Sequence, residues 1–425
     1  MRILMLSQFY PPFIGGEAMQ VQALSAELAA RGHDVAVVTL WHQGLAPFEE
    51  EQGVRVYRVR SSSQRIPWLF SNRGRRRAPP FPDAEVMLAL RHIIAQEHPE
   101  IVHAHNWLVH SFLPLKAWSG ARLVMTLHNY NLVCVNTSLM YRGTHCQGPA
   151  FIKCLGCAAN HYGLVKGTPI VLSHRMMSPI ERSLVDMFLP VSQATALGNG
   201  LLSNRQPFQI IPNFMPGDAS MPQGDCEPYL TQLPAQDYLL FVGALNRQKG
   251  IDVLLNAYTR IANAPPLVLI GYQTPDWPLL ASMCSDNVYV LKDWPRAAVM
   301  QAWRRSLIAL QPSVGPETFG MAAMEAMAAG CPVIASRIGG LGDLVADDET
   351  GFLVTPGDVL ALSQAIERLL AQPDLRSRMG QAAIQKASEF QASIVVPRIE
   401  CVYEELLHKT SPSRKIELRG DEVAI

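Results

Sequence analysis

The sequence contains no apolar run of about 18 residues, the length that a helix needs to cross a bilayer, although 48% of its 425 residues are hydrophobic. No transmembrane span is therefore predicted. The apolar start of the chain, from Met1 to Leu6, is too short for a secretory signal and is typical of a buried first strand. We expect a cytoplasmic protein whose eight cysteines are reduced.

The chain also lacks a net charge. Lys plus Arg and Asp plus Glu both number 36, so no broad positive field is present and no nucleic-acid partner is expected. A G-x-G-x-x-G fingerprint is missing after the first apolar segment, which disfavours a nicotinamide dinucleotide. No Asp-x-Asp stands at the end of an expected strand to hold magnesium. No magnesium site of this kind is therefore expected.

Short apolar segments alternate with helical patterns along the chain, which predicts parallel sheets covered by helices. The expected strands are 3–6, 35–40, 54–59, 101–104, 123–126, 187–190, 209–211, 238–242, 267–270, 288–290, 307–310, 333–335 and 352–354. The predicted fold class is α/β, with two doubly wound domains that face a cleft. Their expected bounds are 1–212 for the first domain, 213–235 for the linker, 236–390 for the second domain, and 391–425 for a C-terminal helix that packs back toward the first domain and ends in a frayed tail.

The segment from Phe319 to Ala329 reads as an apolar helix with one charge, Glu325. Its helical neighbours are Met and Ala, and a buried carboxylate is costly unless something binds it. Glu317 lies in the preceding loop, where Gly320 leaves backbone amides open. Two carboxylates at a helix N-terminus can bind a polyhydroxylated anion. The alternative is that Glu317 lies in solvent and Glu325 pairs with a buried Arg or Lys.

This segment resembles the E-x7-E signature of family 4 glycosyltransferases, which have the GT-B fold of two Rossmann-like domains, and the resemblance extends over most of the chain. It implies a retaining, metal-independent hexosyltransferase of polysaccharide biosynthesis that uses no cofactor in catalysis. The implied donor is a UDP- or GDP-sugar, and the implied acceptor is a lipid-linked glycan or a polysaccharide. It also implies that Glu317 contacts the donor sugar, that Glu325 contacts the ribose, and that the amides around Phe319, Gly320 and Met321 bind the diphosphate.

A second motif begins at Gly243, which ends the first expected strand of the second domain and should border the donor. Arg247 and Lys249 follow at the start of a helix, where two cations can bind a diphosphate. The segment resembles the G-R-L-x-x-x-K-G motif of the family, with Lys249 at the matching position and Ala244 in place of the usual arginine. We expect Lys249 to bind phosphate and Arg247 to act as the substitute, although such a sequence is also typical of a solvated turn.

Two further features of the first domain are expected to border the cleft. Gly15 and Gly16 precede the first helix and let the loop approach a donor, although a plain helix N-terminus is the alternative. His128 follows the strand at 123–126, and the resemblance makes it the histidine of the catalytic centre, near the transferring sugar and the acceptor hydroxyl. Asn129 stands where many relatives have Asp, which removes a charge.

Two more histidines, His103 and His105, lie at the end of the expected strand 101–104. We expect their rings to face opposite sides of the strand. One of them would then be structural, and the other would be available to the cleft.

Four cysteines lie in a short segment after His128, namely Cys134, Cys146, Cys154 and Cys157. The last two form the C-x2-C half of a zinc site, and the other two complete four thiolates. Some relatives in the family carry a cysteine-bearing insert at this place. We predict a structural zinc ion, with reduced buried thiols as the alternative.

Two other functions share this architecture. A nucleotide-sugar epimerase would form product from the donor alone, and a non-enzymatic nucleotide-sugar-binding protein would bind the donor without turnover. The arginines of 65–77 also permit peripheral contact with anionic lipid at the inner membrane face, and a solvated loop is the alternative.

Overall fold

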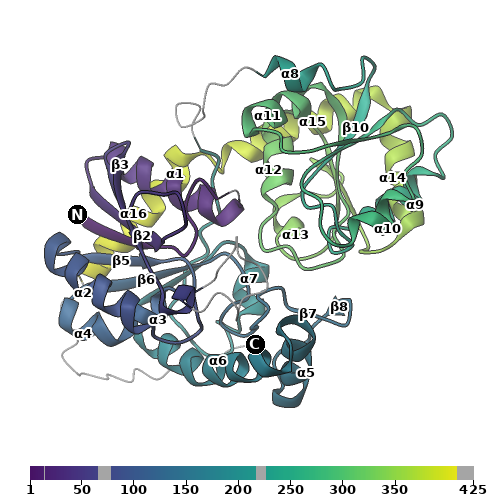
Figure 1. The fold of residues 1–425 in the computed structure, drawn as a ribbon. Coiled ribbons are helices and arrows are strands. Elements are labelled where there is room, and N and C mark those ends of the chain that lie inside the picture. The colour runs from purple at the N-terminus through teal and green to yellow at the C-terminus, as the bar shows by residue number, and fades with distance from the viewer. Residues whose placement is uncertain (14, 66–77, 217–225, 409–425) are drawn as a thin grey trace, which may run out of the picture.

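The computed structural model describes residues 1–13, 15–65, 78–216 and 226–408, which form two lobes (Figure 1). The first lobe is built on a seven-stranded sheet of order β3-β4-β2-β1-β5-β6-β9. Every neighbouring pair is parallel except β3 and β4. The strands are β1 (Arg2–Leu6), β2 (Asp34–Leu40), β3 (Phe48–Glu51), β4 (Val54–Val59), β5 (Ile101–Ala104), β6 (Arg122–Leu127) and β9 (Met187–Pro190).

Local sequence signals set the ends of the first helices. The side chain of Asp83 accepts hydrogen bonds from two backbone amides of the first turn of α2 and caps it. Gly32, with φ of 87°, follows the end of α1 as a left-handed residue. The helices of this lobe are α1 (Gly16–Ala30), α2 (Ala84–Glu97), α3 (Val109–Phe112), α4 (Lys116–Ser119), α5 (Phe151–Tyr162), α6 (Leu164–Leu184) and α7 (Gln193–Gly198), with 3-10 turns η1 (Ser62–Arg65) and η3 (Leu113–Leu115).

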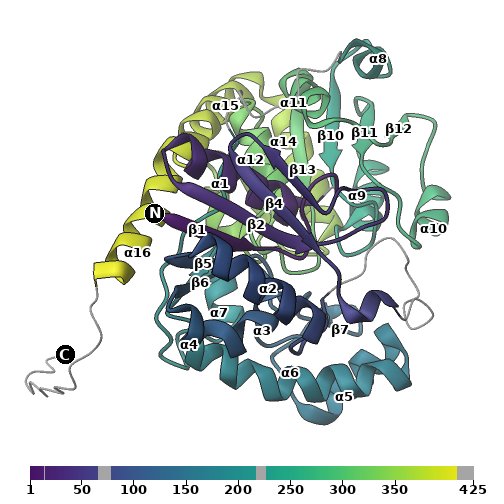
Figure 2. The ribbon, with the colours of Figure 1, turned by 60° about the vertical axis from the view of Figure 1, so that its left-hand side comes forward.

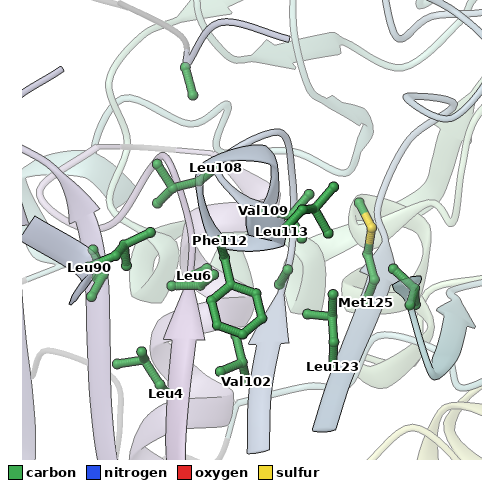
Figure 3. Packing of buried hydrophobic residues seen from close by; sticks show 14 of the residues in the cluster. Leu4, Leu6, Leu90, Val102, Leu108, Val109, Phe112, Leu113, Leu123 and Met125 are labelled. Carbon is green, nitrogen blue, oxygen red and sulfur yellow. The ribbon is translucent and has the colours of Figure 1, made fainter. Parts of the chain in front are cut away.

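The core of the first lobe has two layers because side chains along a strand alternate between the faces of the sheet. Leu4 and Leu6 of β1 pack on one face together with Phe112, as Figure 3 shows. Ile3 and Met5 of the same strand pack on the other face. Burying each such side chain stabilises the fold by roughly 1.5–3 kcal/mol, so both faces of the sheet are fixed by apolar contact.

The second lobe has a six-stranded, fully parallel sheet of order β12-β11-β10-β13-β14-β15. Its strands are β10 (Tyr238–Val242), β11 (Leu267–Ile270), β12 (Val288–Leu291), β13 (Ser306–Gln311), β14 (Val333–Ser336) and β15 (Gly351–Val354). Its helices are α8 (Glu227–Leu230), α9 (Ile251–Tyr258), α10 (Trp277–Ala281), α11 (Arg296–Arg305), α12 (Met321–Ala328), α13 (Leu341–Leu344), α14 (Val359–Ala371) and α15 (Pro373–Ser388).

The last described helix, α16 (Ala392–His408), belongs to the core of the first lobe. Val395, Ile399 and Tyr403 of this helix are buried in one cluster with Ile3 and Val21. Figure 2 shows α16 beside α1 and the start of β1. The end of the described chain therefore crosses back and covers the first sheet.

The predicted fold class is confirmed, because two parallel-sheet α/β lobes are present. The strand expected at 209–211 is wrong. This segment donates two backbone hydrogen bonds to β9 but forms only an isolated bridge, between Phe208 and Phe188. Pro207 and Pro212 flank it, and a proline has no N–H to extend a ladder.

Strand β3 and the hairpin of β7 (Met140–Tyr141) and β8 (Thr144–His145) were not expected from the sequence. The predicted basic loop at 65–77 and the predicted tail at 409–425 lie outside the described residues, except for Arg65, whose guanidinium pairs with Glu85 at 2.5 Å. Within the described ranges, no helix combines the length and the apolar character required to span a membrane.

Candidate active site

Lys249 and Glu317 meet in the second lobe, although they are far apart in the sequence. The Lys249 ammonium donates a hydrogen bond to Glu317 Oε1 at 2.5 Å, and the Ser313 hydroxyl donates to the same oxygen at 2.7 Å. The Lys249 side chain is 33% exposed and that of Glu317 is 15% exposed. The pair is therefore half-buried and still reachable from solvent.

Backbone geometry holds the two loops against each other. The carbonyl of Gln248 accepts hydrogen bonds from the amides of Val314 and Gly315 at 2.9 and 3.0 Å. Gly250 has φ of 72°, and a Cβ at this position would lie 1.9 Å from the carbonyl oxygen of Pro312. Only glycine allows this close approach, so Lys249 is fixed beside the loop that carries Glu317.

The carboxyl group of Glu317 is ionised despite its surroundings. Burial alone would raise its pKa, but the charge of Lys249 and the hydrogen bonds from Lys249 and Ser313 together lower the pKa below its ordinary value. A fixed anion and a fixed cation thus lie side by side. Such a pair can accept hydroxyl protons on one side and bind phosphate oxygens on the other.

Glu325 pairs with an arginine, which is the alternative that the sequence left open for this residue. Glu325 lies in α12, and its Oε1 accepts a hydrogen bond from Nε of Arg296 in α11 at 2.8 Å. Burial nevertheless raises the pKa of Glu325, although the charge of Arg296 opposes the shift. The simpler alternative, a partly buried ion pair, is the arrangement found. The sequence did not reveal the cation because Arg296 lies 29 residues away.

The two lobes contact each other at the loop between Glu317 and α12. The carbonyl of Thr318 accepts hydrogen bonds from the hydroxyls of Ser192 and Thr195, at 2.5 and 3.0 Å. Gly16 of the first lobe faces Met321, since a Cβ built on Gly16 would lie 3.9 Å from Met321 Cγ. The glycine turn before α1 and the N-terminus of α12 therefore border the same interlobe space.

Several other predicted site residues have separate positions. The Arg247 side chain is 56% exposed, and its Nε lies 4.0 Å from Oδ2 of Asp252. The ring of Phe319 is buried 5.6 Å from that of Phe390, so only its backbone faces the site. Gly320 is left-handed, with φ of 107°, and Gly243 approaches the left-handed limit with φ of 155°.

The prediction that His103 and His105 face opposite sides of the strand is wrong. Side chains two residues apart in a strand point to the same face, and the two rings stack with centroids 4.3 Å apart. His105 Nδ1 lies 3.0 Å from Nε2 of His128. His103 in turn contacts the hydroxyl of Tyr403 at 2.6 Å. The three histidines form a row that reaches α16, in which His103 and His105 are buried and His128 is partly exposed.

The environment of His128 differs from that of an exposed catalytic base. Burial lowers its pKa to about 4, although a hydrogen bond with Asn213 opposes the shift. Burial also lowers the pKa of His103 to about 3 and places the pKa of His105 well below its ordinary value. All three rings are therefore uncharged at neutral pH.

A polar pocket lies in the first lobe beside Asn129. It holds about 350 Å³ of non-protein space, part of it open to solvent, and its walls include Asn106, Trp107, Asn131 and Glu17. Asn131 is 3% exposed and Trp107 is 5% exposed. Among the described residues, neither the side-chain amide of Asn131 nor the indole N–H of Trp107 has a hydrogen-bond partner.

Buried polar groups normally have hydrogen-bond partners, so such orphans need an explanation. Water or a ligand hydroxyl in the pocket would supply the missing hydrogen-bond partner. Sequence reasoning missed Asn131 and Trp107 because neither carries a charge or belongs to a recognisable motif.

The four clustered cysteines are free thiols, and they lie close enough to affect one another. Burial, followed by the charges of Cys134, Cys154 and Cys146, raises the pKa of the Cys157 thiol. Across the described ranges, however, no three His, Cys, Asp or Glu side chains are arranged to hold a metal ion. The described residues show no assembled metal site, so zinc binding by these cysteines stays a prediction.

Comparisons with known proteins show which enzymes the chain is similar to. The family model described as Glycosyltransferase Family 4 matches residues 14–213, and the model described as Glycosyl transferases group 1 matches residues 232–386. A glycogen synthase of Mycobacterium tuberculosis is 28% identical over 95% of this chain and 94% of its own length. A D-inositol 3-phosphate glycosyltransferase of Thermobifida fusca is 33% identical over 40% of this chain and 43% of its own.

Solved structures share the fold at low identity. A sucrose-phosphate synthase from Thermosynechococcus elongatus has a TM-score of 0.72 at 21% identity and covers 96% of this chain and 99% of its own. The Anabaena protein HepE, in complex with UDP-glucose, has a TM-score of 0.67 at 16% identity. This match covers 95% of the present chain and 99% of HepE. The fold is therefore that of the GT-B glycosyltransferases.

The two matched regions together span most of the chain. The chain is a glycosyltransferase, and its first lobe is similar to the family 4 enzymes.

Proposed function

We propose that this enzyme moves a hexose from a nucleotide-diphosphate sugar to a glycan or lipid-linked acceptor, with retention of anomeric configuration. The observation that carries the proposal is the pairing of Lys249 with Glu317 beside the N-terminus of α12. The crystallised Anabaena protein of the same fold is described in complex with UDP-glucose, which supports a nucleotide sugar as the donor.

In this proposal the donor lies between the glycine turn of the first lobe and α12. Lys249 binds the diphosphate, with Arg247 as the second cation and the amides around Gly320 as further donors. Glu317 accepts hydrogen bonds from hydroxyls of the transferring sugar. Binding of the donor replaces part of the contact between Lys249 and Glu317 with contacts to phosphate.

Charge develops on the leaving diphosphate when its bond to the anomeric carbon breaks. Lys249 lies where it can stabilise that charge, a role that we assign to it without a metal ion. The acceptor oxygen bonds to the same face of the anomeric carbon, and its proton passes to a departing phosphate oxygen. Glu317 then needs no role as a general base.

Glu325 and His128 have supporting roles in this proposal. Glu325 keeps its ion pair with Arg296, and its other carboxylate oxygen binds the ribose. His128 is uncharged at neutral pH, since burial lowers its pKa to about 4. It therefore acts near the transferring sugar as a hydrogen-bonding group rather than as a cation.

The acceptor has a separate place in the first lobe. The unpartnered groups of Asn131 and Trp107 line a pocket whose wall includes Asn129, the neighbour of His128. An amide and an indole N–H match the hydroxyls of an uncharged sugar ring. We assign this pocket to the terminal sugar of a polysaccharide or of a lipid-linked glycan.

Turnover with a defined donor tests the proposal and separates it from its rivals. Purified protein is supplied with UDP-, GDP- and ADP-hexoses, with and without a mixture of glycan acceptors, and the products are separated by chromatography. The proposal requires a new glycosidic product that depends on the acceptor. Product formed from the donor alone would identify an epimerase, and donor binding without any product would identify a binding protein.

Two predictions from the sequence continue as separate proposals. The first is a structural zinc ion held by the four clustered cysteines. Metal analysis of protein purified without chelator should give one zinc per chain, and a value near zero would refute it. The second is a cytoplasmic location with peripheral contact to the inner membrane face.

A further inference from the structure

Helix α6 carries an exposed stripe of apolar side chains. Val165, Leu172 and Met176 are 84%, 45% and 71% exposed, and Pro169 lies between them on the same side. Their spacing of four, three and four residues places them on one face of the helix. On the preceding helix, α5, Ile152 is 83% exposed. Figures 1 and 2 place α5 and α6 along the lower edge of the first lobe.

This stripe does not serve the packing of the fold. The opposite face of α6 is already buried through Val171, His174 and Met177. Contiguous exposed apolar patches of this kind mark interaction surfaces. One face of the helix therefore packs on the core of the lobe, and the second face is free to contact an apolar partner outside the molecule.

The charge around the stripe has one sign. From residue 101 to residue 180 the sequence contains no Asp or Glu, whereas Lys153, Lys166 and Arg175 lie within α5 and α6. The Arg175 guanidinium lies 5.6 Å from the centroid of the Phe151 ring, which links the two helices. A surface of apolar side chains flanked only by cations complements an anionic lipid bilayer.

We propose that α5 and α6 form the membrane-docking surface of this protein and that its partner is an anionic bilayer. A second copy of the chain is a poorer partner, because two such surfaces would bring cations together without an opposing carboxylate. The apolar stripe enters the interfacial layer, and Lys166 and Arg175 contact lipid phosphates. Only the position of Arg65 is described among the arginines of 65–77, and the proposal does not depend on them.

The same helix pair connects the bilayer to the cleft. Cys157, Asn160 and His161 of α5 line a pocket whose other wall is formed by Arg247 and Gln248 of the second lobe. If the proposed transfer to a lipid-linked acceptor is right, docking through α5 and α6 brings that acceptor to the edge of the active site. Membrane binding itself does not rest on the transfer reaction.

Vesicle co-sedimentation of the full chain tests the docking surface. The probes are vesicles of phosphatidylglycerol mixed with phosphatidylcholine, and vesicles of phosphatidylcholine alone. The stripe variant combines Val165→Ser, Leu172→Ser and Met176→Ser. The matched control combines Leu88→Ser, Leu279→Ser and Leu360→Ser, whose side chains are 61%, 56% and 55% exposed elsewhere on the molecule.

The wild-type protein and the control should bind the anionic vesicles equally, and the stripe variant should bind at least about tenfold more weakly, because burial of apolar area drives the insertion. A charge variant, Lys166→Gln with Arg175→Gln, should lose the preference for anionic lipid. Equal binding by the stripe variant would overturn the proposal, and so would a wild-type protein that ignores both kinds of vesicle.

Sedimentation velocity without lipid tests whether a second copy of the chain, rather than a bilayer, covers this surface. A wild-type dimer that becomes a monomer in the stripe variant would assign the surface to a second copy and overturn the proposal. Transfer to a soluble acceptor should be unchanged in the stripe variant. Loss of vesicle binding with normal transfer therefore separates failure of docking from failure of the proposed enzyme activity.

Discussion

Replacement of Lys249 by Met should separate the structural role of its ion pair from its catalytic role. The substitution keeps most of the side-chain length and removes the charge. Glu317 then loses the cation and one of the two hydrogen bonds that now lower its pKa. Burial is left as the dominant influence, so the pKa of Glu317 should rise above its ordinary value.

The cost in stability follows from the exposure of the pair. Removal of one partner from a fully buried ion pair costs about 3–5 kcal/mol. The Lys249 side chain is 33% exposed, so solvent screening reduces this to about 1–3 kcal/mol. For a lobe of this size, the melting temperature should fall by roughly 3–10 °C. Transfer should fall about a hundredfold or more, as for loss of one group that stabilises charge in a transition state.

The double variant Lys249→Met with Glu317→Gln makes the test sharper. With both charges removed, no unpaired carboxylate remains, and the melting temperature should recover most of its loss. Transfer should not recover, because both groups proposed to contact the donor are gone. Calorimetric melting and initial rates with a saturating donor provide the two readouts. Recovery of transfer in the double variant, or wild-type transfer in Lys249→Met, would refute the reasoning.

Three further substitutions test other contacts. Arg296→Met should lower the unfolding free energy by about 2–4 kcal/mol, because it leaves Glu325 unpaired, and denaturant titration should show partial recovery when Glu325→Gln is added. Gly250→Ala should destabilise by at least about 1–3 kcal/mol, because φ is positive there and a Cβ would collide with the carbonyl oxygen of Pro312. Gly342→Ala, whose Cβ would meet no atom within 4 Å, should change the unfolding midpoint little. Equal midpoints for the two variants would contradict this. His103 has a folded pKa of about 3, below its unfolded value, so stability should fall as the pH decreases from about 6.5 toward that value. His103→Gln should flatten the dependence by roughly 1 kcal/mol per pH unit, and an unchanged slope would count against it.

The sequence was sufficient to predict the parallel strands because strands buried on both faces are continuous apolar runs. Tyr238–Val242 and Ile101–Ala104 were expected with the bounds that the structure has. Strand β3 could not be predicted, since its sequence Phe-Glu-Glu-Glu has no apolar period and pairs only with β4 at the edge of the sheet. The hairpin of β7 and β8 consists of two-residue strands, which are too short for any periodicity.

The site was less predictable than the fold, because long-range pairing decides it. Local pattern identified Lys249 and Glu317 separately, but only the fold brings them within 2.5 Å of each other. The same limit applies at Glu325, whose partner could not be named from the sequence because Arg296 lies on a neighbouring helix. Asn131 is a candidate only because its amide is buried without a partner, a property that no sequence pattern encodes.

Calorimetric titration of the wild-type protein and the Lys249→Met variant with UDP, GDP and ADP tests the central claim, that Lys249 and Glu317 face the diphosphate and sugar of the donor. At least one of these nucleotides should bind the wild-type protein, and the variant should bind it at least about tenfold more weakly, as expected for loss of a charge-assisted hydrogen bond. Equal affinity in the two proteins, or no binding of any nucleoside diphosphate to the wild type, would contradict it.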